Sequence, residues 1–240
     1  MEDVGRAFTY MFQDERWVTK ILIGGGFVIL SAIIGGIWGV IISPFGGTAA
    51  NAVLAILTNL VSLAASAFYI GYAVETLQNV ADGRELPLPE WTDIGRKFYL
   101  GVILGIVLFV YQLPASILGA LAGGIGAFGL AGAAAGGALG CVALLVLLFV
   151  SFITPAIVIS FAQSPTFAGG FNFPRIFEII GASLGWYLVV ILLTIVAFII
   201  SIFGLIGLVI GVFFTIFWAF LVTANLLGRL ARHTAGKARA

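Results

Sequence analysis

The sequence predicts an all-α integral membrane protein, a polytopic bundle of about six transmembrane helices arranged as three helical hairpins. Two observations predict this fold. The 240-residue chain is 62% hydrophobic and only 9% charged, whereas an average soluble domain carries about 25% charged residues. The charged residues also gather in four short zones, separated by uncharged blocks that are each long enough for two membrane crossings. A soluble core of this size cannot bury so much apolar surface, so lipid is the expected solvent.

The uncharged blocks set the number of helices. They cover residues 21–74, 98–174 and 179–228. A transmembrane helix needs about 20 residues, so each block is too long for one crossing and long enough for two. Two crossings return the chain to its starting side, so all four charged zones are expected on one side. Because Lys and Arg in short loops mark the cytoplasmic side, we expect a protein of the cell membrane with both termini in the cytoplasm.

The charge pattern also divides the chain, which is expected to form a single membrane domain over 1–240. The expected parts are an interfacial stub (1–18), hairpin 1 (19–74), a cytoplasmic loop (75–97), hairpin 2 (98–163), a second cytoplasmic loop (164–178), hairpin 3 (179–228) and a basic cytoplasmic tail (229–240). The hairpins share the spacing from a charged start to a first glycine, which is typical of parallel repeats. Any two hairpins of apolar helices look alike, however, so chance similarity remains an alternative.

Two segments have more than one interpretation. The stub has apolar residues at helical spacing, which predicts an N-terminal amphipathic helix in the plane of the lipid headgroups; the alternative is a frayed tail. The stretch Gly119–Gly140 is nearly all Gly and Ala. It forms either the ends of two long, tightly packed helices or a re-entrant turn, which would have to be shielded by protein.

The polar loop contains the most specific motif, Leu88-Pro89-Glu90-Trp91. Together with Arg16-Trp17, Gly71-Tyr72, and Tyr111 with Pro114, this motif resembles the domain-of-unknown-function family 4013, a group of prokaryotic multi-pass membrane proteins. The resemblance covers most of the chain and implies a helical membrane protein. It implies no activity and no catalytic residues.

The same four residues, Leu88, Pro89, Glu90 and Trp91, have two physical interpretations. Two prolines two residues apart hold the loop extended, and tryptophan favours the headgroup level. The loop is then a rigid interfacial re-entry into the bilayer. The alternative is a docking loop for a soluble partner.

The residues needed for catalysis or for cofactor binding are scarce. His233 is the only histidine and Cys141 the only cysteine, so the sequence predicts no metal site, no cofactor and no enzyme. The net charge of +1 gives no reason to expect a nucleic-acid partner. The expected partners are the lipid bilayer and other membrane-protein subunits.

Uncharged polar residues inside the expected spans leave the function open. Asn51, Asn59, Gln112 and Asn225 either join helices by hydrogen bonds or line a polar groove. The first alternative favours a non-catalytic membrane protein that acts as a scaffold or accessory subunit of a membrane assembly. The second favours a passive permease or lipid-handling protein.

Overall fold

The computed structural model describes residues 5–36, 48–207 and 210–237, apart from the side chains of 48–56, 59 and 237. Over these residues the ordered elements are all helices. Six of them are long and apolar enough to cross a membrane. The predicted all-α bundle with six candidate spans is therefore confirmed.

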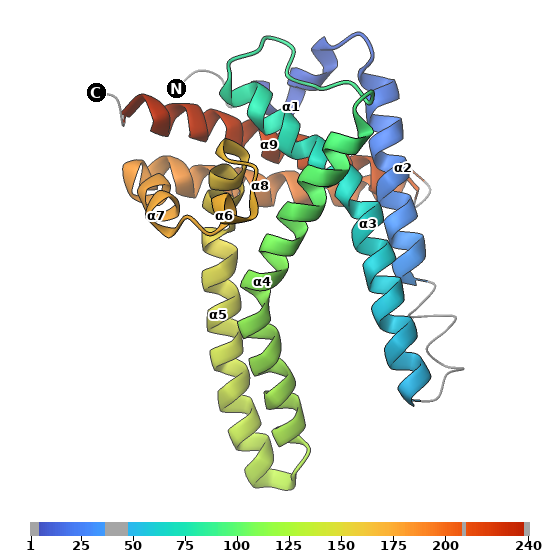
Figure 1. Ribbon diagram of the computed structural model, residues 1–240, viewed down its shortest axis with the longest axis vertical. Coiled ribbons are helices and arrows are strands. Elements are labelled where there is room, and N and C mark those ends of the chain that lie inside the picture. The colour runs from blue at the N-terminus through green and yellow to red at the C-terminus, as the bar shows by residue number, and fades with distance from the viewer. Residues whose placement is uncertain (1–4, 37–47, 208–209, 238–240) are drawn as a thin grey trace.

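The first pair of long helices is α2 (Trp17–Gly36) and α3 (Thr48–Ala81). Residues 37–47, which connect the two helices of the expected hairpin 1, lie outside the described residues. Where the two helices touch, the Ser62 hydroxyl donates to the Ser31 carbonyl (3.2 Å) and Phe27 stacks on Phe68. The pair runs along the long axis of the molecule (Figure 1).

The second pair is α4 (Ile94–Gly126) and α5 (Gly129–Gln163), and both helices extend into the Gly- and Ala-rich stretch. Only residues 127–128 separate the helices, and Gly129 takes a φ of 70°, which favours glycine. Of the two interpretations of Gly119–Gly140, long and tightly packed helices are correct and a re-entrant turn is not. The helices have 33 and 35 residues, so each is about 50 Å long, well beyond an apolar bilayer core of about 30 Å.

The third part of the chain is more broken than predicted. Two short helices, α6 (Phe167–Gly170) and α7 (Phe173–Ala182), precede α8 (Leu184–Ile202), η4 (Phe203–Ile206) and α9 (Gly211–Lys237). The start expected for hairpin 3, residue 179, lies inside α7. That helix is amphipathic, burying Ile176 and Ile179, and it ends before Ser183, where the chain turns into α8.

The last two long helices, α8 and α9, run across the other four instead of beside them (Figure 1). Of these two, α9 packs against α2 at a pair of glycines. A side chain at Gly24 would overlap the ring of Phe217, and one at Gly25 would overlap the ring of Phe214. The tilt of a membrane helix is set by packing against its neighbours, and the two glycines leave room for the rings of α9 where it crosses α2.

The second close contact joins α3 and α4. A Cβ at Gly71 would overlap the carbonyl oxygen of Lys97, and a Cβ at Gly101 would overlap that of Ala67. Backbone therefore lies against backbone at two places four residues apart on α3. Small residues are used for this purpose in membrane helices.

The N-terminal stub forms α1 (Arg6–Thr9) and η1 (Tyr10–Gln13), two short turns instead of one helix. Its apolar side chains face protein. Ala7 and Met11 are fully buried, and the half-buried Phe8 contacts the ring of Trp218 on α9. The predicted amphipathic pattern is present, but α9 occupies much of the apolar face that was expected to meet lipid.

The described residues of the four charged zones lie toward one end of the molecule, the charged end, away from the tip of the α4–α5 hairpin (Figure 1). Arg16 of the first zone pairs with Glu90 of the second. Gln78 lies in the second zone, where its side-chain oxygen accepts a hydrogen bond from Arg96. Its amide donates to the carbonyl of Ala162, next to Gln163 at the end of α5. Arg175 of the third zone donates to Gln163 at 2.9 Å. Arg84 of the second zone and Arg232 of the fourth line the same pocket.

Candidate functional site

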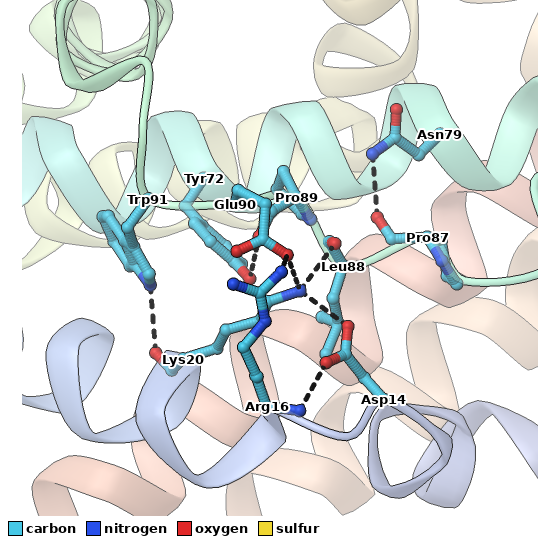
Figure 2. Close-up of polar contacts among 10 residues, drawn as sticks. All are labelled: Asp14, Arg16, Lys20, Tyr72, Asn79, Pro87, Leu88, Pro89, Glu90 and Trp91. Carbon is cyan, nitrogen blue, oxygen red and sulfur yellow. Dashed lines mark hydrogen bonds and ion pairs between the residues drawn. The ribbon is translucent and has the colours of Figure 1, made fainter.

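A buried ammonium group lies in the middle of a set of polar contacts between α2, α3 and the loop after α3 (Figure 2). The Lys20 side chain is only 4% exposed. Its Nζ lies 2.6 Å from Asp14 Oδ2 and 2.8 Å from Glu90 Oε1, and it donates to the Leu88 carbonyl at 3.2 Å. We call Asp14, Arg16, Lys20 and Glu90 the Lys20 cluster.

Arg16 completes the cluster from its outer side. Its guanidinium Nη2 lies 3.0 Å from Glu90 Oε1, and its backbone N–H donates to Asp14 Oδ1 at 2.8 Å. Burial by itself would raise the pKa of Asp14. The hydrogen bonds from Lys20 and the Arg16 backbone, with the charges of both residues, outweigh burial and hold this pKa below its usual value. Asp14 therefore stays ionised and keeps the lysine charge compensated.

The loop after α3 is fastened to the membrane helices through its main chain. The Tyr72 hydroxyl donates to the Pro89 carbonyl (2.8 Å) and the Asn79 amide donates to the Pro87 carbonyl (2.9 Å). From the loop, the Trp91 indole N–H donates to the Lys20 carbonyl (3.2 Å). The prolines hold the loop extended. The carbonyls of Pro87 and Pro89 therefore face α3, while that of Leu88, between them, faces Lys20 of α2 (Figure 2).

Tyr72 joins this loop to the apolar core. Its ring is fully buried, stacks on Trp91 at 4.4 Å and lies near Phe217 of α9. The Lys97 ammonium lies 5.8 Å from the centre of the same ring and pairs with Glu75 at 3.0 Å. Aromatic and cation–π contacts of this kind fix ring orientation as well as adding stability.

The predicted docking residues are thus already engaged within the chain. Leu88 and Pro89 are buried, and Glu90 and Trp91 are partly exposed. These contacts favour the interpretation of a rigid interfacial re-entry. Asp93 then caps the following helix, accepting from the Arg96 backbone N–H at 3.0 Å. Docking of a soluble partner on this loop stays a prediction.

The four residues of the predicted polar groove are not shown as one site. Asn225 is buried on α9, where its Oδ1 accepts from Arg229 Nε at 2.7 Å. Gln112 is half-buried on α4 and does not line the pocket that contains Asn225. The side chains of Asn51 and Asn59 lie outside what the structure describes. A groove made by all four stays a prediction.

A second site at the charged end was not predicted from the sequence. It is an open pocket of about 870 Å³ between the stub, the loop after α3, the start of α8 and the end of α9. Four arginines line it. They come from zones far apart in the chain, so only the fold brings them together: Arg6, Arg84, Arg229 and Arg232.

Sequence reasoning also missed Asp14 and Lys20. Both look like ordinary charges beside a first membrane span. The available signal was their position, because a lysine one helical turn into α2 (Trp17–Gly36) needs a compensating partner when the helix packs against protein. Among the described residues, no three His, Cys, Asp or Glu side chains lie close enough to hold a metal ion.

Three of the four features that carry the family resemblance meet in this region: Arg16 contacts Glu90, and Tyr72 contacts Pro89 and Trp91.

Comparison with known proteins agrees with the resemblance. No curated protein and no solved structure matches the chain. The model of one family, described as protein of unknown function DUF4013, matches residues 53–212. Since the match spans well over half of the 240 residues, the chain belongs to this family of proteins, the domain-of-unknown-function family 4013.

Proposed function

We propose that this protein is a non-catalytic scaffold or accessory subunit of a membrane assembly, held in the cell membrane with both termini in the cytoplasm. The observation that supports it best is an open small-residue surface on the far half of the α4–α5 hairpin. The orientation is supported by the position of the basic zones toward one end, because short loops rich in Lys and Arg favour the cytoplasmic side.

Between α4 and α5, small residues allow the two helix backbones to touch. A Cβ at Gly136 of α5 would lie 2.5 Å from the Ala122 carbonyl oxygen of α4. The two backbones are in contact there. In lipid, close packing of this kind is a main source of helix association, because apolar chains gain little by leaving an apolar solvent.

The outer surface of the same hairpin is also rich in glycine, but no other helix of the described chain packs against these glycines. A Cβ would meet no described atom within 4 Å at any of four glycines: Gly119, Gly123 and Gly124 of α4, and Gly137 of α5. Gly119 and Gly123 lie four residues apart, so they share one helix face. A membrane helix of another subunit can approach this face as closely as α5 approaches α4.

The competing function, a passive permease or lipid-handling protein, needs a polar path across the bilayer. Of the two predicted groove residues whose side chains are described, Asn225 lies at the charged end, where its side chain accepts a hydrogen bond from Arg229. That position supports a role at the membrane surface more than a role at the centre of a path.

The test adds bulk to the open face without disturbing the fold. Gly123→Leu places a good helix former on the face, and Gly26→Leu is the matched control, because Gly26 of α2 is also exposed with open space around it. The protein is purified natively from its membranes and weighed with its bound partners. We expect a stoichiometric protein partner with the wild type and Gly26→Leu, and its loss with Gly123→Leu at an unchanged unfolding temperature.

The competing function predicts a different result. A wild-type protein that purifies as a monomer and moves a solute or lipid across reconstituted vesicles would overturn the scaffold. Retention of the partner by Gly123→Leu would show that this face is not the contact surface.

A further inference from the structure

The pocket at the charged end combines strong positive charge with an apolar wall. Among the residues that line it, four arginines stand against one carboxylate, Glu85. His233 also lines the pocket. The excess positive charge is gathered from three separate segments, so it is a property of the folded site and not of one basic helix.

The arginines are positioned by neighbouring groups. Arg229 is held by its hydrogen bond to the buried Asn225 (2.7 Å). Arg232 reaches the loop after α3, where its Nη1 lies 3.1 Å from the place a Cβ on Gly83 would take. Gly83 has a φ of 80° and no side chain, so this arginine can lie close to the backbone beside Arg84.

The stub closes the pocket from the other side. The Tyr10 hydroxyl donates to the Leu221 carbonyl of α9 at 3.0 Å, which fixes η1 against that helix. Burial raises the pKa of Tyr10 strongly, against the smaller lowering effect of Arg229. The phenol therefore stays neutral and does not offset the arginine charge.

The rest of the wall is apolar. Val190 and Trp186 of α8 and Leu226 of α9 line it, and Leu86 lies at the loop with 57% of its surface exposed. A small inorganic anion would use the arginines and leave these side chains unused. A ligand with a charged group and an adjoining apolar part uses both.

We propose that this pocket binds the phosphate of an anionic phospholipid headgroup, with the glycerol and upper acyl chains against Trp186, Val190 and Leu86. Arginine forks match phosphate oxygens in geometry and charge. Basic pockets between membrane helices on the cytoplasmic side bind such headgroups, and the volume of about 870 Å³ is in the range of ligand sites. The proposal is independent of the assembly proposed above and requires only that the charged end lie at a membrane surface.

The test compares two charge-matched double variants of the full chain. Arg84→Gln with Arg232→Gln removes two pocket arginines. Arg96→Gln with Arg175→Gln removes two arginines from the same end that do not line this pocket. Each protein is unfolded thermally in detergent alone, then with added phosphatidylglycerol, phosphatidylcholine or inorganic phosphate, because a ligand that binds the folded state raises the unfolding temperature.

We expect phosphatidylglycerol to stabilise the wild type and the control variant more than phosphatidylcholine does. The pocket variant should bind phosphatidylglycerol about 100-fold more weakly, since each arginine removed deletes a charge-assisted hydrogen bond to the phosphate of about 1.4 kcal/mol, or about tenfold. The control variant loses no such contact. Equal binding by the pocket and control variants would overturn the site. Stabilisation by inorganic phosphate as large as that by phosphatidylglycerol would overturn the lipid source. Unfolding in detergent alone shows whether each variant is folded before lipid is added.

Discussion

Replacing Lys20 by Met tests the Lys20 cluster directly. Methionine keeps an unbranched side chain and removes the ammonium group. The change deletes a buried group that contacts Asp14 at 2.6 Å and Glu90 at 2.8 Å and donates to the Leu88 carbonyl at 3.2 Å. It leaves one carboxylate nearly buried, because the Asp14 side chain is 12% exposed, and another partly in water, because Glu90 is 42% exposed.

The exposures set the expected magnitude. Removing one partner of a buried ion pair costs about 3–5 kcal/mol, whereas exposed pairs contribute about 0–1 kcal/mol. Lys20 has one contact of each kind, and Glu90 keeps Arg16 as a partner. We therefore expect Lys20→Met to lower the free energy of unfolding by about 2–4 kcal/mol. Asp14→Asn in the Lys20→Met background should cost much less than in the wild type, because the contact is already lost.

The measurement is reversible unfolding in detergent–lipid micelles. Arg175→Met is the control, since Arg175 pairs with Glu178 at 2.9 Å but these side chains are 22% and 50% exposed. The control should lose no more than about 1 kcal/mol. If Lys20→Met lost no more than the control, the buried cluster would not stabilise the fold and the reasoning would be refuted.

Three further predictions use other parts of the structure. Gly71→Ala places a methyl group on the Lys97 carbonyl oxygen, and should lower the free energy of unfolding by about 1–3 kcal/mol in the same micelles. Asp14 has a lowered pKa in the folded state, so its contribution is complete above the pKa of the unfolded chain and lost as pH falls through the folded pKa; Asp14→Asn should weaken the loss of stability measured on acidification. In a background without Cys141, a cysteine at residue 126 should react with an impermeant label from outside intact cells and one at residue 82 should not; labelling of residue 82 would contradict the proposed orientation.

The number of candidate spans could be predicted because it depends on little more than length and charge. Three uncharged blocks of two-span length give six helices and place four charged zones together, whatever the packing. The contact of Arg16 with Glu90, 74 residues apart, agrees with that placement. The crossing of α9 over α2 cannot be predicted from the length or charge of the sequence. Gly24 and Gly25 look like ordinary membrane glycines, and only the position of α9 shows that they receive Phe217 and Phe214.

The loop could be noticed in the sequence, but its partners within the fold could not, for a similar reason. Leu88-Pro89-Glu90-Trp91 is noticeable in the sequence because its residues are adjacent. The groups that hold it come from elsewhere: Lys20 from α2, and Tyr72 and Asn79 from α3. The four arginines of the pocket are scattered over 227 positions, from residue 6 to residue 232. No local pattern can reveal such a group, because the chain topology alone brings its members together.

The Lys20 cluster and the basic pocket share two segments, and this gives a final prediction. Gln13 lines the pocket one residue before Asp14, and Pro87 lines it one residue before Leu88, whose carbonyl accepts from Lys20. Lys20 itself does not line the pocket. Lys20→Met should therefore loosen both walls, and weaken stabilisation by phosphatidylglycerol without removing a pocket charge. Arg175→Met, which also removes one positive charge from this end, should leave that stabilisation unchanged. Equal effects of the two substitutions would mean that bulk charge attracts the lipid, and that the cluster does not shape the pocket.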